Sequence, residues 1–191
     1  YLYKMTKIGN NLIKKNIQKL ITGNFEKLAP TYYRLISEWM NSSYEVFNDI
    51  DKYRIILYLI NKDFEQYIQI KKIESYDNFF MFDKSLELDR INIIEISKSL
   101  NIPKESTRRK ILDLEKLNVL QKIGKKIYID RSAYRLVQPK NTLKNLSALL
   151  SKISEILKIE NLIDKSLNVD EVSEHLKDNF SYCWYYFYIF I

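Results

Sequence analysis

The sequence of 191 residues contains little cysteine, histidine, glycine or proline, and each scarcity excludes a class of protein. Its one cysteine, Cys183, cannot form a disulfide within the chain. Together with the one histidine, His175, it also excludes a zinc site built from clustered Cys and His ligands. The three glycines are isolated, which excludes a glycine-rich phosphate loop, and the three prolines leave few helix breakers. We therefore expect mainly helical structure, with no metal and no cofactor.

The sequence also lacks an uninterrupted apolar run long enough to span a bilayer. The aromatic-rich end, residues 180–191, is too short for a span unless it is part of a longer segment. No basic-plus-apolar signal peptide is present at the start, where Tyr1 stands in place of an initiator methionine, as in a fragment. With no disulfide framework, these features favour a reducing interior, so we expect a cytoplasmic protein with no membrane partner.

No group of residues has the spacing of a catalytic site. A single His and a single Cys have no second partner for a nucleophilic triad. His175 lies near Glu171 and Glu174 and is most simply a residue on a helix surface. Carboxylates are numerous, but their spacing does not distinguish an acid/base pair. We expect no catalytic residue and no enzymatic activity.

Positive charge is concentrated in one segment. Of the 31 Lys+Arg and 24 Asp+Glu residues, 13 basic and 6 acidic ones lie between residues 89 and 140, a net charge of +7. The other 18 basic and 18 acidic residues cancel. A merely solvated surface would spread the excess more evenly, so this segment indicates a polyanionic partner such as nucleic acid.

The basic segment has the pattern of two short helices followed by a hairpin. Apolar residues at helical spacing predict a helix over 91–100, and Pro103 suits the first turn of a second helix over 103–117. Asn118 is suited to the left-handed conformation that ends a helix. The β-prone runs 119–123 and 126–129 then flank Gly124 and Lys125, which predicts a hairpin with a basic tip.

The second helix has an inner and an outer face. At about 100° per residue, Thr107, Ile111 and Leu114 share the inner face, and Arg109 lies on the outermost face. We expect Arg109 to contact a DNA base and Lys125 and Lys126 to hold phosphate, because guanidinium and ammonium groups are suited to these contacts. The full set of expected DNA-binding residues is Lys104, Glu105, Ser106, Thr107, Arg108, Arg109, Lys110, Lys116, Lys122, Lys125, Lys126 and Arg131.

Helix, turn, basic helix and basic hairpin in this order resemble the winged helix-turn-helix of bacterial transcription regulators. The likeness is carried by the turn Leu100-Asn101-Ile102, by Ser106-Thr107-Arg108-Arg109 and by the stretch from Leu114 to Leu120. Pro103 departs from the serine or aspartate N-cap common in such families, and Asn118 from their commoner glycine. With helices before and after, the order is similar to that of the MarR family, in which terminal helices of two subunits interlock.

The resemblance implies a mainly α fold: a three-helix core plus a β-hairpin wing, flanked by N- and C-terminal helices. It divides the chain into an N-terminal helical region (1–74), a winged helix-turn-helix DNA-binding domain (75–138) and C-terminal helices (139–191), a candidate dimerisation region. It also implies double-stranded DNA as a partner, a homodimer and a small-molecule effector.

Apolar spacing predicts further helices on both sides of the basic segment. Before it we expect helices over 1–22, from Pro30 onward and over 48–68, with a kink or a break at 41–43 and a connection over 75–88. In the second of these, the residues expected on one side are Tyr33, Ile36, Trp39 and Met40.

After the basic segment we expect an amphipathic helix over 143–157, capped by Asn141 or Thr142, which packs on its own N-terminal helices or on a second subunit. A final helix is expected from about Asn168 into the aromatic tail. That tail is either a buried terminal helix or subunit interface, or a ligand pocket lined by Tyr182, Trp184, Tyr185 and Tyr186.

These patterns favour sequence-specific binding of double-stranded DNA by a transcriptional regulator. The helix over 103–117 would enter the major groove and the basic wing over 122–128 would contact the adjacent backbone. Two alternatives are a winged-helix module that binds protein and a replication-initiation or partition protein.

Overall fold

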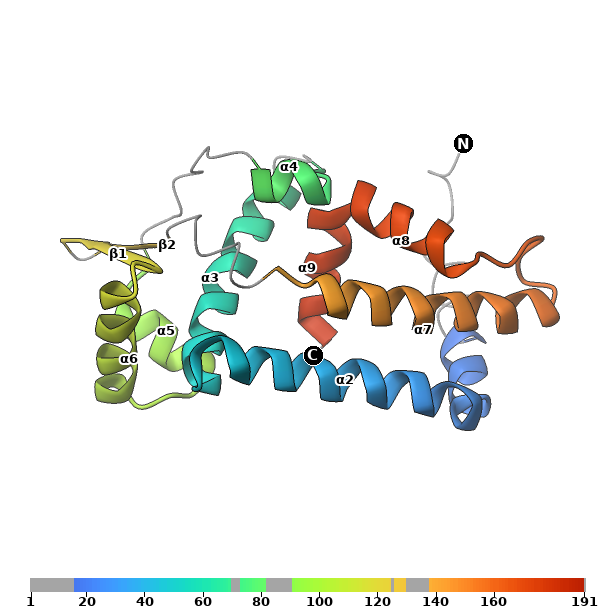
Figure 1. The fold of residues 1–191 in the computed structure, drawn as a ribbon, viewed down its shortest axis with the longest axis horizontal. Helices are drawn as coiled ribbons and strands as arrows, with labels where there is room; N and C mark the ends of the chain where they lie inside the picture. The colour runs from blue at the N-terminus through green and yellow to red at the C-terminus, as the bar shows by residue number, and fades with distance from the viewer. Residues whose placement is uncertain (1–15, 70–72, 82–90, 125, 130–137, 191) are drawn as a thin grey trace. The chain divides into compact units, whose positions relative to one another are not determined.

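The computed structural model describes residues 16–69, 73–81, 91–124, 126–129 and 138–190. Within these ranges the chain is mainly helical, as the sequence predicts (Figure 1). Residues 16–23 are helical. The elements that follow are α2 (Phe25–Phe47), α3 (Ile50–Gln69), α4 (Tyr76–Met81), α5 (Ile93–Leu100), α6 (Lys104–Lys116), β1 (Leu120–Ile123), β2 (Lys126–Ile129), α7 (Lys140–Ile159), α8 (Val169–Asp178) and α9 (Phe180–Phe190). Of the helices described, none combines the length and the apolar character needed to cross a bilayer.

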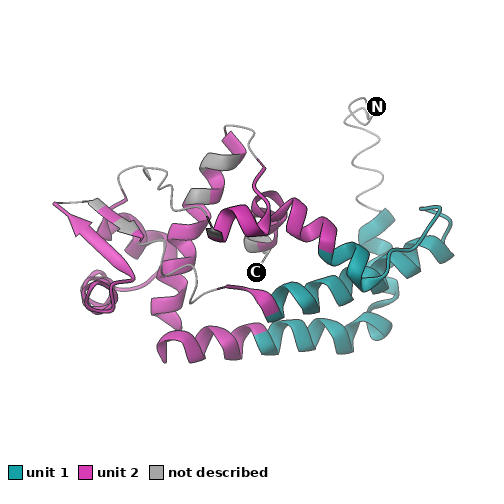
Figure 2. Ribbon diagram, turned by 45° about the horizontal axis from the view of Figure 1, so that its top comes forward, with its two compact units in different colours: residues 1–38, 141–173 teal, residues 39–140, 174–191 magenta. Residues whose placement is uncertain are grey.

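The chain packs as two compact units, each assembled from separate stretches (Figure 2). Unit 1 comprises residues 1–38 and 141–173, and unit 2 comprises residues 39–140 and 174–191. Each unit combines segments from before and after the hairpin.

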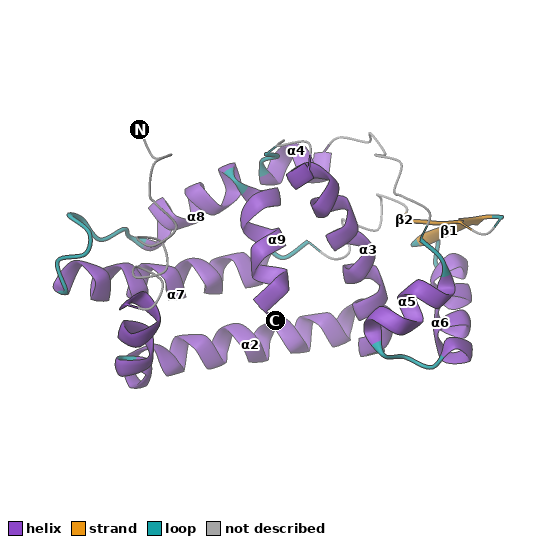
Figure 3. Ribbon diagram, turned by 180° about the vertical axis from the view of Figure 1, so that it is seen from behind, coloured by secondary structure: helices purple, strands orange, loops and turns teal. Residues whose placement is uncertain are grey.

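In unit 1, α7 lies alongside the N-terminal part of α2 (Figures 1 and 3), and the Asn145 amide donates a hydrogen bond to the Glu38 carboxylate. The buried face of α7 is more polar than its leucine and isoleucine spacing suggested. The hydroxyls of Ser151 and Ser154 donate to the carbonyl of Leu167 at 2.9 and 3.2 Å. Side-chain hydrogen bonds therefore hold the connection after α7 against the helix.

Helix α2 differs from its expected form at both ends. It begins at Phe25 with Pro30 inside it, and it continues through residues 41–43, where the sequence predicts a kink or a break. Pro30 removes only one backbone hydrogen bond, and the Ser43 hydroxyl is satisfied within the helix by donating to the Trp39 carbonyl at 2.6 Å. Its fully buried apolar side chains are Leu28 and Leu35, whereas Tyr33 and Met40, which were expected on a packing face, are exposed.

The core of unit 2 is built around α3. Its side chains Ile55, Ile56 and Leu59 are completely buried, and the helix contacts α5, α6, β2 and α9. The three helices that pack together beside the hairpin are therefore α3, α5 and α6. Helix α3 precedes the range 75–138 that the sequence assigned to this domain.

Aromatic side chains form the other half of the unit 2 core. The Phe180 ring on α9 lies 5.9 Å from the ring of Phe64 and 5.6 Å from that of Phe79, between ring centroids, and it stacks on Trp184 at 5.5 Å. The expected connection at 75–88 contains a short helix, α4, which contributes Phe79. The expected single C-terminal helix is instead two helices, α8 and α9, separated at Asn179.

Candidate nucleic-acid interface

Helix α6 packs with one face inward, as its periodicity predicts. Thr107, Ile111 and Leu114 are fully buried, and α6 contacts α3, α5 and β1. The helix begins at Lys104, after Pro103 in an extended conformation, and ends at Lys116. The opposite face of α6 is consequently left free to meet a partner.

A turn without glycine joins α5 to α6. Asn101 adopts the left-handed conformation with a φ of 53°, and the Ile102 amide donates to the Ser97 carbonyl at 3.1 Å. The Ile102 carbonyl accepts the Ser97 hydroxyl at 2.7 Å and the Thr107 hydroxyl at 3.4 Å. Hydroxyl groups from both helices thus fix the turn that directs the start of α6.

The other end of α6 leads directly into the hairpin. Asn118 has a φ of 56°, as expected for a left-handed cap, and the Val119 amide donates to the Leu114 carbonyl at 2.9 Å. Strands β1 and β2 pair antiparallel, with Ile123 opposite Lys126. Gly124, with a φ of 64°, supplies the positive φ that a two-residue hairpin connection requires.

The outward face of α6 carries cations along its whole length. Lys104, Arg108, Arg109 and Lys116 are exposed, and Glu105 lies among them. The Arg108 Nε is 3.0 Å from the Glu105 Oε2, a surface ion pair that holds both side chains loosely. Arg109 has no ion-pair partner within the described part of the chain. None of the ion pairs in that part of the chain neutralises its guanidinium, which lies on the exposed face of the helix.

Two residues of the expected DNA-binding set do not lie on that face. The Thr107 side chain is 0% exposed, and its hydroxyl donates to the Pro103 carbonyl at 3.2 Å. The Lys110 side chain is 20% exposed, and its Nζ lies 2.5 Å from the Asp49 Oδ2. Thr107 is therefore a core residue, and Lys110 is paired with the start of α3. Neither residue is part of the exposed cationic face of α6.

The remaining expected residues are placed only in part. Ser106 is half-buried beside α6's exposed face, and Lys122 is exposed on β1. Lys125 and Arg131 lie outside the described residues, and the structure describes the backbone of Lys126 but not its side chain. The candidate interface therefore comprises the exposed face of α6 together with β1.

The sequence-based set omitted an apolar residue on the same face. Leu112 is 41% exposed, between Arg109 and Lys116. The helical spacing of 100° per residue places it near Arg109, so the pattern could have identified it. The main partner of Lys110 could not have been found this way, because Asp49 is 61 residues away in the sequence.

The carboxylate that pairs with Lys110 has a shifted pKa. Burial alone would raise the pKa of Asp49, but hydrogen bonds from Lys110 and from the backbone amides of Lys52 and Asp51 outweigh it and lower the pKa. Asp49 is therefore held in its charged form beside the lysine. The charged carboxylate favours a persistent ion pair between Asp49 and Lys110, so the lysine is not free to contact phosphate.

Two further expectations from the sequence concern a metal site and the aromatic tail. In the ranges described, no three His, Cys, Asp or Glu side chains are grouped so that they could hold a metal ion. Trp184 of the aromatic tail is buried, whereas Tyr182 and Tyr186 are exposed and contact each other. Phe180 and Trp184 are therefore packed as a buried terminal helix requires.

Comparison of the chain with known protein families, with curated proteins and with solved structures finds no match. The function is therefore argued from the geometry of α6 and the hairpin.

Proposed function

We propose that this protein binds double-stranded DNA sequence-specifically as a transcription regulator, with α6 in the major groove and β1–β2 as a wing. The observation that carries the proposal is the polarity of α6. One face is anchored by Thr107, Ile111 and Leu114, and the opposite face presents exposed Arg108 and Arg109. A cationic helix held by its inner face and followed at once by a hairpin is the arrangement that groove binding needs.

The exposed groups suit two kinds of contact. Arginine binds guanine through two parallel hydrogen bonds in the major groove. Arg109 is exposed and has no ion-pair partner among the described residues, so it is the first candidate for that contact. Lys104, Lys116 and Lys122 lie toward the two ends of α6 and on β1, where they would neutralise phosphates and release counterions.

The resemblance to winged helix-turn-helix regulators extends the proposal to the whole assembly. A homodimer would place two copies of α6 on half-sites about one helical turn apart, so its site would be a short palindrome. A small-molecule effector would act on that dimer.

The test is selection from a random duplex library, followed by titration of the selected duplex over a salt series, with the solution mass recorded. We expect selection of a palindromic site, a dimer mass and an affinity that falls steeply with salt. Direct repeats in the selected DNA would favour an initiator protein instead. Absence of binding at low salt would refute the proposal.

Variants then test the face assignment. Arg109→Ala should weaken binding to the selected duplex by about 10- to 100-fold, as expected for one lost base contact. The matched control is Lys152→Ala with Lys158→Ala, two exposed cations on α7 in unit 1. These should change affinity little. Equal losses of affinity in Arg109→Ala and in the double control variant would mean that only overall charge matters.

One observation favours protein binding as a second candidate function. Leu112, Leu117 and Ile123 are 41%, 57% and 63% exposed on α6, at its end and on β1. Exposed apolar side chains beside a basic face also occur in protein interfaces. If the chain bound no duplex, this surface would become the leading candidate.

A further inference from the structure

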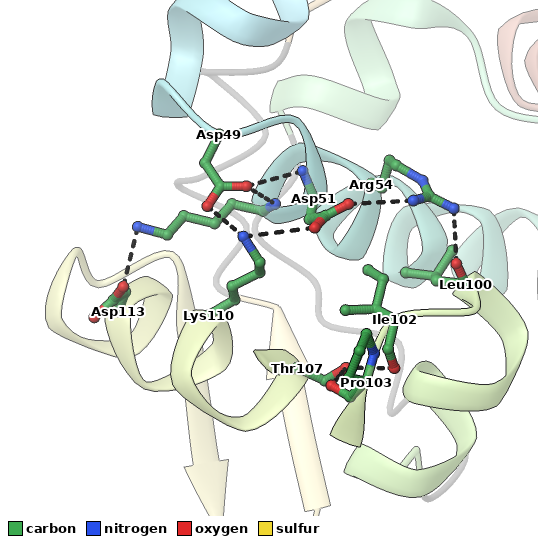
Figure 4. A network of polar contacts seen from close by, with 10 residues as sticks. Asp49, Asp51, Arg54, Leu100, Ile102, Pro103, Thr107, Lys110 and Asp113 are labelled. Carbon is green, nitrogen blue, oxygen red and sulfur yellow. Dashed lines mark hydrogen bonds and ion pairs between the residues drawn. The ribbon is translucent and has the colours of Figure 1, made fainter. Parts of the chain in front are cut away.

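Three ion pairs, two of one sense and one of the opposite sense, join the start of α3 to one side of α6 (Figure 4). The Lys110 Nζ of α6 lies 2.5 Å from the Asp49 Oδ2 and 3.6 Å from the Asp51 Oδ2. In the reverse direction, the Lys52 Nζ of α3 lies 3.1 Å from the Asp113 Oδ2 of α6. Each helix thus contributes one cation and at least one carboxylate, so the pattern is specific for one alignment.

Asp49 makes this attachment rigid. Its Oδ1 accepts the backbone amides of Asp51 at 3.0 Å and Lys52 at 3.2 Å, which caps the start of α3. Its other oxygen, Oδ2, accepts Lys110. Because the carboxylate is already held by the helix start, the lysine is paired with a fixed group rather than with a mobile side chain.

Arg54 attaches the preceding helix, α5, to the same part of α3. The Arg54 Nη2 on α3 donates to the Leu100 carbonyl at the end of α5 at 2.8 Å, and its Nη1 is 3.2 Å from the Asp51 Oδ1 (Figure 4). The end of α5 and the middle of α6 are therefore both attached to the first turns of α3.

Rotation of α6 about its axis is the quantity that these contacts control. Ile111 and Leu114 determine which face is inward, but apolar contacts are non-directional. A rotation of about 20° would displace a side-chain tip about 6 Å from the helix axis by about 2 Å. That displacement exceeds what a two-bond contact of an arginine with a base tolerates.

We propose that Lys110, Asp49, Lys52 and Asp113 are positioning residues that set the rotation of α6 and thereby its base specificity. The inference rests on the proposed DNA binding. It assigns Lys110 an internal role in place of the DNA contact expected from the sequence. Neutralised by Asp49, this lysine contributes alignment rather than attraction to the polyanion.

Charge exchange at Lys52 and Asp113 tests the proposal, because alignment and net charge predict opposite signs. Asp113→Lys adds two positive charges to α6, so simple attraction predicts tighter binding to all DNA. Misalignment predicts weaker binding to the selected duplex, by about tenfold, with binding to unrelated duplex unchanged or tighter. Combining it with Lys52→Asp restores both the pairing and the net charge, and should return the specific affinity to within about twofold of the wild type.

The salt dependence of binding separates Lys110 from the phosphate contacts. Lys110→Gln should weaken specific binding without changing the slope of log affinity against log salt. The matched control, Lys104→Gln, should reduce that slope by about one unit, as loss of one phosphate contact does. A one-unit decrease for Lys110→Gln would overturn the assignment.

Thermal unfolding of each variant, monitored by circular dichroism, shows whether it is folded at the titration temperature. If Asp113→Lys does not fold, Asp113→Asn removes the pair with a smaller charge change and should still lower the ratio of specific to unrelated affinity. An unchanged ratio in the folded variants would refute the positioning role while leaving DNA binding intact. Failure of the wild type to bind any duplex would instead refute the proposed function itself.

Discussion

The Thr107 hydroxyl shows how a side chain of the basic helix can serve the turn rather than the surface. It is fully buried and within hydrogen-bonding distance of the Ile102 and Pro103 carbonyls. Thr107→Val keeps the shape and removes the donor, so we expect the free energy of unfolding to fall by about 1 kcal/mol. DNA affinity of the folded variant should be unchanged.

Urea denaturation and duplex titration at one temperature measure the two effects separately. The control is Thr22→Val, where an exposed hydroxyl donates to the Gln18 carbonyl within a helix. A large loss of affinity in Thr107→Val without loss of stability would return this residue to the DNA-binding set.

Asp49 makes stability depend on acid pH with a definite sign. Because its pKa is lowered in the folded chain, its contribution is fully present above the unfolded-state pKa near 3.8. The contribution is lost as the pH falls through the lower folded-state pKa. We expect the free energy of unfolding of Asp49→Asn to decrease less than that of the wild type below about pH 4.

Equilibrium denaturation at a series of pH values measures this difference. Asp178→Asn, at the exposed end of α8, is the matched carboxylate-to-amide control. Parallel curves for Asp49→Asn and the wild type would contradict the stabilising pair.

Sequence reasoning succeeded for single residues where the period of one helix decides. The inner face of α6 was predicted correctly at Thr107, Ile111 and Leu114, and so was the left-handed cap at Asn118. It could not predict that Lys110 pairs with Asp49, because a helical period contains no information about a partner in another helix. Exposed and paired lysines look alike in a sequence.

At the scale of elements, the end of α6 depends on a strained residue. Asn118 holds a φ of 56°, a conformation that costs a residue with a Cβ about 1 kcal/mol or more and costs glycine little. We expect Asn118→Gly to raise the melting temperature and Asn118→Ala to lower it by a few degrees. Thermal denaturation of both variants in one buffer gives the comparison. If Gly and Ala substitutions at a position with ordinary helical φ changed the melting temperature in the same order as at Asn118, this account would be contradicted.

Other element boundaries were mispredicted for local physical reasons. The sequence predicts a helix start at Pro30 and a kink or a break at 41–43, whereas α2 contains all of these residues. A proline removes one hydrogen bond, and a serine can bond to its own helix, so neither prevents a helix whose other residues favour it. Periodicity predicts one helix that runs from Val172 and Leu176 into the aromatic tail. In the structure the two parts are separate helices, α8 and α9, with Asn179 between them.

At the scale of the molecule, unit 2 depends on residues at the far end of the chain. Phe180 is 1% exposed and contacts rings from α3 and α4. Phe180→Ala should lower the free energy of unfolding by about 3–5 kcal/mol, because a large buried ring leaves a cavity. Tyr186→Ala, 41% exposed on the same helix, is the control and should cost much less. Urea denaturation distinguishes the two, and equal losses would mean that Phe180 is not a core residue.

Long-range packing of this kind explains what the sequence could not predict for the whole chain. The mainly helical fold follows from composition and periodicity. The placement of α3 beside α5 and α6, and of α9 on α3, requires contacts between residues far apart in the sequence, such as Tyr58 with Glu95 and Phe64 with Phe180. Such contacts depend on shape complementarity, which a pattern of apolar residues does not encode.

The one cysteine of the chain gives access to the motion of this C-terminal helix. Cys183 lies half-buried on α9, and burial raises the pKa of its thiol. Alkylating reagents attack the thiolate, so the folded protein should be modified slowly at neutral pH, and faster as the pH rises. Mass spectrometry of the wild-type chain would follow that reaction with no other thiol to interfere. Faster modification in Phe180→Ala would report the detachment of α9, and the natural sequence already carries the label site.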